Sequence, residues 1–103
     1  MSISQAIPKG GEYYYHFKHN PQKDIFNYAY KIIGLAIHSE TEELLIVYKP
    51  LYSDNHVYKL HADFNARPLN LFLEDVNKPE INYSGPRFRL ITDLGILNTL
   101  QKV

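Results

Sequence analysis

The stretch that decides the fold is YAYKIIGLAIHSETEELLIVYKP, residues 28–50. Two apolar runs, YAYKIIGLAIHS and ELLIVYKP, meet at the polar segment SETE. Isoleucine, valine and tyrosine favour strands, and short polar residues favour turns. The stretch therefore predicts a β-hairpin made of the two most apolar strands of the chain. Gly34 lies inside the first run and predicts a bend or a close backbone approach there.

Shorter runs on either side predict further strands. EYYYHFK (12–18) and RFRLI (87–91) have strand-forming composition, and LYSDNHVYKLH (51–61) predicts a turn followed by a weak strand around Val57, Tyr58 and Leu60. In ARPLNLFLEDV, Pro68 starts one expected helical turn that ends at Phe72 before an extended segment.

The tail TDLGILNTLQKV carries leucines at three-residue spacing, which predicts a short helix with Thr92 as its N-cap. We therefore expect a mainly β fold, a small antiparallel β-barrel or sandwich of five or six short strands with a C-terminal helix. Closure into a barrel is favoured, because it would remove the exposed edges. The expected organisation is a flexible arm over 1–10, a barrel over 11–91 and a helical tail over 92–103.

Composition narrows the function. The chain has 103 residues with 11 basic and 11 acidic side chains, and this neutral balance disfavours a dedicated nucleic-acid binder. It has no cysteine, which removes disulfides, thiol catalysis and cysteine zinc sites, and no motif points to a cofactor. The longest apolar run, IIGLAI, is too short to cross a bilayer, and the N-terminal segment lacks a signal-like apolar core. We expect a cytoplasmic protein without a membrane partner.

Four segments in a fixed order resemble a family of small bacterial proteins of unknown function. They are YYYHFKH (13–19), YKIIGLAIHSETEELLIVYKPLY (30–52), ARPLNLFLE (66–74) and RFRLI (87–91), and together they span nearly the whole domain. The resemblance implies an SH3-like β-barrel, in agreement with the strand count, and implies no established activity. A small barrel hosts many unrelated functions, so function has to be argued from a site.

His38, Ser39 and Glu40 are the side-chain types of a nucleophilic triad written in consecutive order. Neighbouring residues of a strand point to opposite faces, so His38 and Ser39 diverge there. Triads are assembled from separated segments. The better interpretation is a hairpin tip in which Ser39 and Thr41 bond the backbone and the glutamates are solvated.

Other histidines and arginines offer weaker candidates. His16 and His19 lie three apart, which separates them on a strand, and a site without cysteine would need ligands such as His16, His38 and Glu40. No ligand spacing matches a known metal pattern, so no metal is predicted. Arg67 can hold an anion through its fork, in a basic patch with Lys18, Lys31, Arg87 and Arg89. The simpler interpretation is that Arg67 pairs with Glu74 or caps a turn.

The leading functional hypothesis is a small non-catalytic binding module for a peptide or a nucleotide-containing partner. Aromatic residues make up 14% of the chain, and an excess of tyrosine suits a groove for extended ligands. In this hypothesis tyrosines stack, an arginine holds an anionic group and histidines donate hydrogen bonds. The candidate ligand-binding residues are His16, His38, Tyr48, Tyr52 and Arg67.

Two other classes of function remain open at this point. One is a small hydrolase or nucleic-acid-processing enzyme with His16 or His38 as general base and Glu40 or Glu74 nearby. The other is a structural or dimerisation domain, in which the leucines of the tail dock on their own barrel or on a second copy. The expected assembly is a monomer or a weak homodimer.

Overall fold

The computed structural model describes residues 6–102. Its centre is the predicted hairpin, formed by β2 (Ala29–Ile37) and β3 (Leu44–Pro50). The strands pair antiparallel from Tyr30 opposite Pro50 to Ile37 opposite Leu44, and the register shifts between Ile32 and Gly34. The bend expected at Gly34 is therefore present as a β-bulge, which raises the local twist of the strand.

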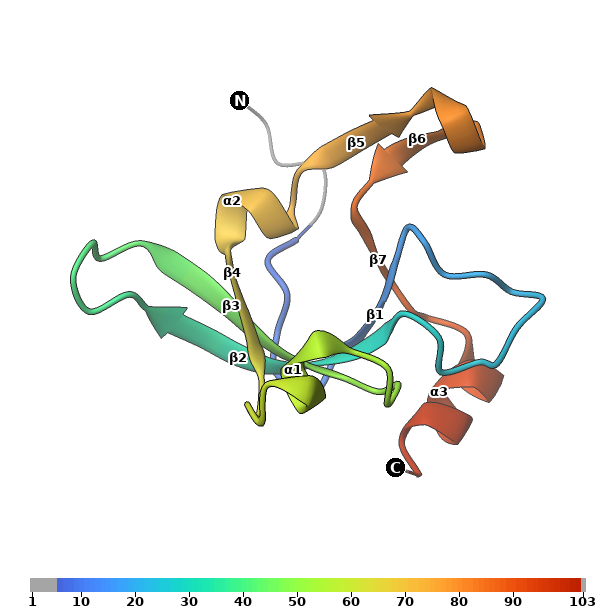
Figure 1. Cartoon of the computed structure of the whole chain (residues 1–103), viewed down its shortest axis with the longest axis horizontal. Coiled ribbons are helices and arrows are strands. Elements are labelled where there is room, and N and C mark those ends of the chain that lie inside the picture. The colour runs from blue at the N-terminus through green and yellow to red at the C-terminus, as the bar shows by residue number, and fades with distance from the viewer. Residues whose placement is uncertain (1–5, 103) are drawn as a thin grey trace.

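Three shorter strands complete the main sheet, which has the order β4-β3-β2-β1-β7. They are β1 (Tyr13–His16), β4 (Asn65–Pro68) and β7 (Phe88–Leu90). A separate two-stranded sheet contains β5 (Asp75–Lys78) and β6 (Tyr83–Pro86), joined through the 3-10 turn η1 (Pro79–Ile81). In Figure 1 this second sheet lies above β7, and the β2–β3 tip extends to the opposite side.

The expected barrel closure is not confirmed. The sheet is open, because β4 and β7 are its two edges and do not pair with each other. Residues 6–102 contain seven strands instead of the five or six expected. The additional strands are β4, which ends on proline, and β6, which contains glycine and ends on proline. Both residue types disfavour strands, so the sequence did not predict these two.

A short helix, α1 (His56–Lys59), replaces the weak strand predicted around Val57, Tyr58 and Leu60. The reason is local: the Asn55 side chain accepts a hydrogen bond from the Val57 amide at 2.9 Å and caps the helix. The weak-strand prediction was wrong because the capping asparagine overrides the strand preference of valine and tyrosine.

The other two helices were predicted, with one correction. α2 (Leu69–Phe72) is the expected turn after Pro68, and α3 (Leu94–Leu100) is the C-terminal helix. The N-cap of α3 is Asp93, which accepts from the Ile96 amide at 3.0 Å, and not Thr92. Within residues 6–102, no helix has the length and hydropathy needed to cross a bilayer.

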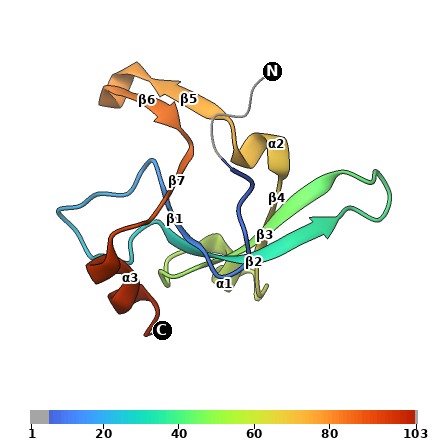
Figure 2. The same ribbon diagram turned by 180° about the vertical axis from the view of Figure 1, so that it is seen from behind.

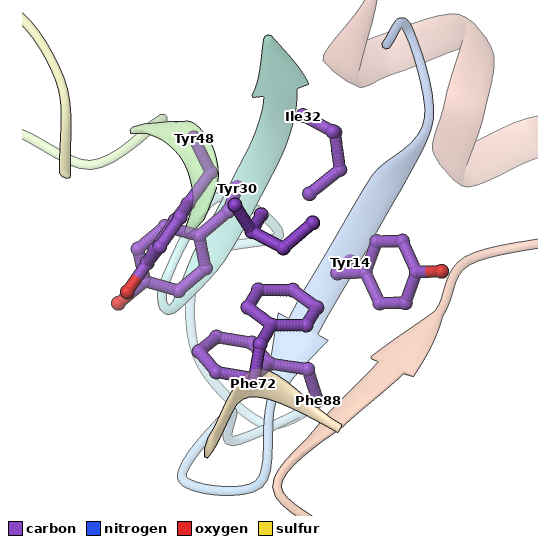
Figure 3. Packing of buried hydrophobic residues seen from close by; sticks show 7 residues of the cluster. Tyr14, Tyr30, Ile32, Tyr48, Phe72 and Phe88 are labelled. Carbon is purple, nitrogen blue, oxygen red and sulfur yellow. The ribbon is translucent and has the colours of Figure 1, made fainter. Parts of the chain in front are cut away.

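Two apolar cores lie on opposite faces of the sheet. The first, shown in Figure 3, joins α2 to four strands and consists of Tyr14, Tyr30, Ile32, Ile46, Tyr48, Phe72 and Phe88. The second holds α3 against the sheet and consists of Tyr13, Tyr15, Ala29, Ile91 and Leu100. The C-terminal helix therefore docks on its own sheet, beside β1 and β7 (Figures 1 and 2).

The N-terminal segment also packs against the sheet. Of the arm expected over residues 1–10, residues 1–5 lie outside the described part, while Pro8 is fully buried. The Gly11 amide donates to the Ile32 carbonyl at 2.9 Å. A Cβ at Gly10 would lie 2.8 Å from the Ile33 carbonyl oxygen, so this close approach requires glycine.

Replacing Phe72 should test the first core. Its ring is fully buried and stacks on Phe88 with centroids 4.1 Å apart, so Phe72→Ala should lower the free energy of unfolding by about 3–5 kcal/mol. Urea unfolding measures the change. The neighbouring Leu71 is 40% exposed, so Leu71→Ala should cost less than about 1 kcal/mol. Equal losses in the two variants would show that the α2 side chains are placed wrongly.

Candidate functional site

A pocket of about 660 Å³ opens between the loop that follows β1 and the segment that follows β3. Tyrosine rings and lysine ammonium groups dominate its lining, namely Tyr28, Tyr30, Tyr52, Lys18, Lys23 and Lys59. Tyr52 and Ser53 also line two smaller hollows of about 360 and 350 Å³ on either side. Tyr52 and Ser53 are therefore shared by all three of these hollows.

Hydrogen bonds fix the Tyr52 ring. Its hydroxyl lies 2.6 Å from the hydroxyl of Tyr30 and accepts a hydrogen bond from the Asn55 side-chain amide at 2.8 Å. Asn55 is buried and is itself held by the cap of α1. Burial, followed by the hydrogen bond with Tyr52, raises the pKa of Tyr30, so this phenol stays protonated. The wall of the pocket is thus preorganised before any ligand arrives.

Tyr28 connects the pocket to β1. Its ring centroid lies 5.3 Å from that of Tyr52 and 5.6 Å from that of His16. Its backbone has a φ of 54°, in the left-handed region that large side chains rarely adopt. The Tyr28 carbonyl accepts a hydrogen bond from the His16 amide at 3.0 Å, which holds this conformation at the entry to β2.

Positive charge surrounds the pocket. Lys59 lies 3.5 Å from Asp54 in an exposed pair, whereas Lys18 and Lys23 form no ion pair with a carboxylate of residues 6–102. Both of these lysines are exposed on the loop after β1. An ammonium group without a local counter-ion is available to an anionic ligand.

Four of the five predicted ligand-binding residues belong to one continuous aromatic cluster. His16 stacks on Tyr28 and meets the edge of Phe88 at 5.1 Å, and Tyr52 joins through Tyr28 and Tyr30. Tyr48 is only 5% exposed; its hydroxyl accepts a hydrogen bond from Arg67 Nε at 3.2 Å. The group therefore shares one side of the sheet, although Tyr48 supports the core more than it offers a surface.

Arg67 does not pair with Glu74, contrary to the simpler interpretation of the sequence. Its guanidinium carbon lies 5.6 Å from the centroid of the Phe88 ring. Glu74 is taken by Arg87, whose Nη2 donates to it at 2.7 Å. Glu74 precedes β5 and Arg87 follows β6, so this ion pair joins the two ends of the segment that forms the second sheet.

His38 does not join the cluster. It stands at the exposed tip of the β2–β3 hairpin, on the far side of the molecule from α3 (Figures 1 and 2). Its Nδ1 accepts hydrogen bonds from the amides of Glu40 at 3.2 Å and Thr41 at 3.3 Å. The hairpin-tip interpretation is confirmed, with the imidazole of His38 in the bonding role expected of Ser39, and no triad forms there.

The sequence of the chain supports only one assignment. The profile of the family described as Protein of unknown function (DUF1653) matches residues 12–90. The chain belongs to this family. No curated protein and no solved structure matches the chain. The family resemblance seen in the four ordered segments is thereby confirmed, and it brings no activity with it.

Histidine–carboxylate pairs and metal-ligand clusters are absent from the part of the domain that the structure describes. No histidine nitrogen of residues 6–102 forms a hydrogen bond or ion pair with a carboxylate. Nor do the same residues contain three clustered side chains that would hold a metal ion. The pocket of this family member instead has tyrosines on its wall and lysines on its rim.

Sequence reasoning missed several residues of the pocket. Asn55 was assigned to a turn, although an asparagine ahead of a short apolar segment is an N-cap signal that points to its capping role. Lys18 carries no signal beyond its place in the basic patch expected with Lys31 and the arginines. The left-handed backbone of Tyr28 has no signal in the residue type, because it is imposed by the contact with His16.

The pH dependence of stability should reveal the environment of His16. Burial, with a smaller effect of the nearby charge on Lys18, lowers its pKa from 6.5 to about 4. Between these pH values the unfolded chain holds the extra proton, so the free energy of unfolding falls as the pH decreases. His16→Gln should lose about 1–2 kcal/mol less than the wild type on acidification from about pH 7 to pH 4, measured by urea unfolding.

His61→Gln is the matched control, because this imidazole is exposed and lies outside both cores. It should keep the pH dependence of the wild type. If His16→Gln and the wild type lose stability in parallel, the buried position of His16 is wrong.

Proposed function

We propose that the domain is a non-catalytic binding module whose site is the tyrosine-lined pocket around Tyr52. The observation that supports this most is the position of the Tyr52 ring, which is hydrogen-bonded at its polar end to Tyr30 and Asn55 and lines three neighbouring hollows. A rigid aromatic ring loses little conformational entropy when a ligand packs on it. Of the five side chains predicted from sequence, the proposal retains Tyr52 as the contact and His16, Tyr48 and Arg67 as its support.

The chemistry of the pocket favours binding over the hydrolytic alternative. A general base needs a proton acceptor within hydrogen-bond reach of the reacting group and a pKa near the working pH. Burial keeps His16 neutral, but the Nδ1 atom accepts a hydrogen bond from the Lys18 amide at 3.1 Å and is thus engaged in the loop. The proposed partner is a peptide or a nucleotide-containing molecule, as the sequence suggested.

We also propose that the curved sheet is related to SH3-like barrels, as the family resemblance implies. The β-bulge in β2 supports this relation, because a bulge bends a strand and increases its twist. A cytoplasmic location stays a prediction from composition.

Substitution of Tyr52 should abolish most of the binding. In ¹H–¹⁵N spectra, a mixture of mononucleotides and short aromatic peptides should shift the amides of residues 18–28 and 52–55. The ligands should be recovered chemically unchanged. Tyr52→Leu should weaken the affinity by about tenfold or more, because one stacking contact is worth about 1–3 kcal/mol.

Tyr83→Leu serves as the matched control, since Tyr83 lies on β6 and stacks on Phe17 away from the pocket. It should bind like the wild type. If no ligand of the mixture shifts the amides of the pocket, or if ligands are consumed, the proposed binding role is wrong.

A further inference from the structure

We infer that the ligand of this pocket is a nucleoside phosphate, with its base against Tyr28 and Tyr52 and its phosphate at Lys18 and Lys23. This inference rests on the proposed binding role and specifies the chemical class of the ligand. Four features support it: the tyrosine rings of the wall, the excess of lysines over carboxylates on the rim, the volume of the pocket, and the hydrogen bonds that already occupy its two asparagine side chains.

The aromatic wall fits a flat ring. Tyr28 and Tyr52 line the pocket together, with their centroids 5.3 Å apart and their planes inclined by 39°. Neither ring can move freely, since Tyr52 is hydrogen-bonded to Tyr30 and Asn55 and Tyr28 is stacked on His16. Stacking of a base on such rings requires only a π-face and little reorganisation of the protein.

The rim is positive although the whole chain is neutral. Three lysines line the pocket and Asp54 is its one acidic side chain, so the rim carries 3 − 1 = 2 net positive charges. Lys59 already pairs with Asp54, which leaves Lys18 and Lys23 to provide the excess. Burial above all, and then the charges of Lys18, Arg87 and Arg67, lower the pKa of neighbouring His16, so two further cationic side chains lie near this side of the pocket.

The extent of the site favours a short ligand. Pockets for small molecules typically have volumes of about 300–1,000 Å³, and this one has about 660 Å³. A long polyanion gains affinity from many phosphate contacts along a basic surface, and a chain with 11 basic and 11 acidic residues does not offer one. The two unpaired lysines are enough to hold the phosphate of one nucleotide, which can be free or the end of a nucleic-acid chain.

The two side-chain amides of the pocket predict weak discrimination between bases. Asn55 uses its amide nitrogen on Tyr52 and its oxygen on the Val57 amide. Asn27 is likewise engaged, with its oxygen accepting from the Asn20 amide and its nitrogen donating to the Asn20 and Asp24 carbonyls. With both amides engaged in the fold, neither is left to read the edge of a base, so adenine and uracil nucleotides should bind within about fivefold of each other.

The test is a titration of the intact domain with AMP, UMP, adenosine, a short oligothymidylate and an acidic peptide that contains tyrosine. Amide shifts of residues 18–28 and 52–55 report occupancy of the pocket. AMP should bind about tenfold more tightly than adenosine, and added salt should reduce this advantage. In Lys18→Gln/Lys23→Gln the affinity for AMP should fall by about five- to tenfold, while that for adenosine should stay unchanged.

Lys78→Gln is the control, because Lys78 is an exposed lysine on β5 outside the pocket. It should bind AMP like the wild type. Oligothymidylate that binds no more tightly than UMP points to free nucleotides, and tighter binding points to the end of a strand; both outcomes support the inference. Equal affinities for AMP and adenosine overturn it.

The two proposals fail in different ways. If the acidic peptide shifts the amides of the pocket and AMP does not, the nucleotide inference is wrong and the binding role stands. If none of the five probes shifts these amides, the binding role and the inference fail together.

Discussion

The burial of β1 on both faces is the constraint on which the rest of the structure depends. Its three consecutive tyrosines alternate, with Tyr14 in the first core and Tyr13 and Tyr15 in the second. The same four-residue strand also bonds β2 on one edge and β7 on the other. β1 therefore contributes side chains to both cores. A chain of this length can in this way bury both faces of one sheet.

The pocket is a consequence of this arrangement. The loop after β1 must return to start β2 beside it, and this places Lys18 and Lys23 opposite the segment after β3. Tyr30 reaches from the core to the hydroxyl of Tyr52, while Tyr14 points its hydroxyl to the other side, as Figure 3 shows. Hydrogen bonds therefore connect the first core to the wall of the pocket. A substitution that displaces Tyr30 should also displace the Tyr52 ring.

The sequence predicted the elements whose information is local. The β2–β3 hairpin, the bend at Gly34, the turn after Pro68 and the C-terminal helix follow from periodicity and from glycine and proline chemistry. The helix at 56–59 was mistaken for a strand, because one capping side chain outweighs a weak propensity. Whether the sheet is open or closed depends on whether its two edge strands pair with each other. The pattern of apolar residues within each strand does not specify its pairing partner.

The candidate site was predicted less completely than the fold. Tyr52, Tyr48, Arg67 and His16 share one cluster, since an excess of aromatic side chains in a small domain has few places to pack. His38 lies outside this cluster. Its imidazole accepts hydrogen bonds from backbone amides of the turn, a role that a histidine can fill as readily as ligand binding. Residue type alone does not distinguish these two uses.

The left-handed backbone of Tyr28 sets two energetic terms against each other. This conformation costs a residue with a side chain roughly 1–2 kcal/mol, and glycine or asparagine would adopt it with less strain. Either replacement would also remove the ring that contacts both His16 and Tyr52. Backbone strain at position 28 is therefore coupled to the one ring that links β1 to the wall of the pocket.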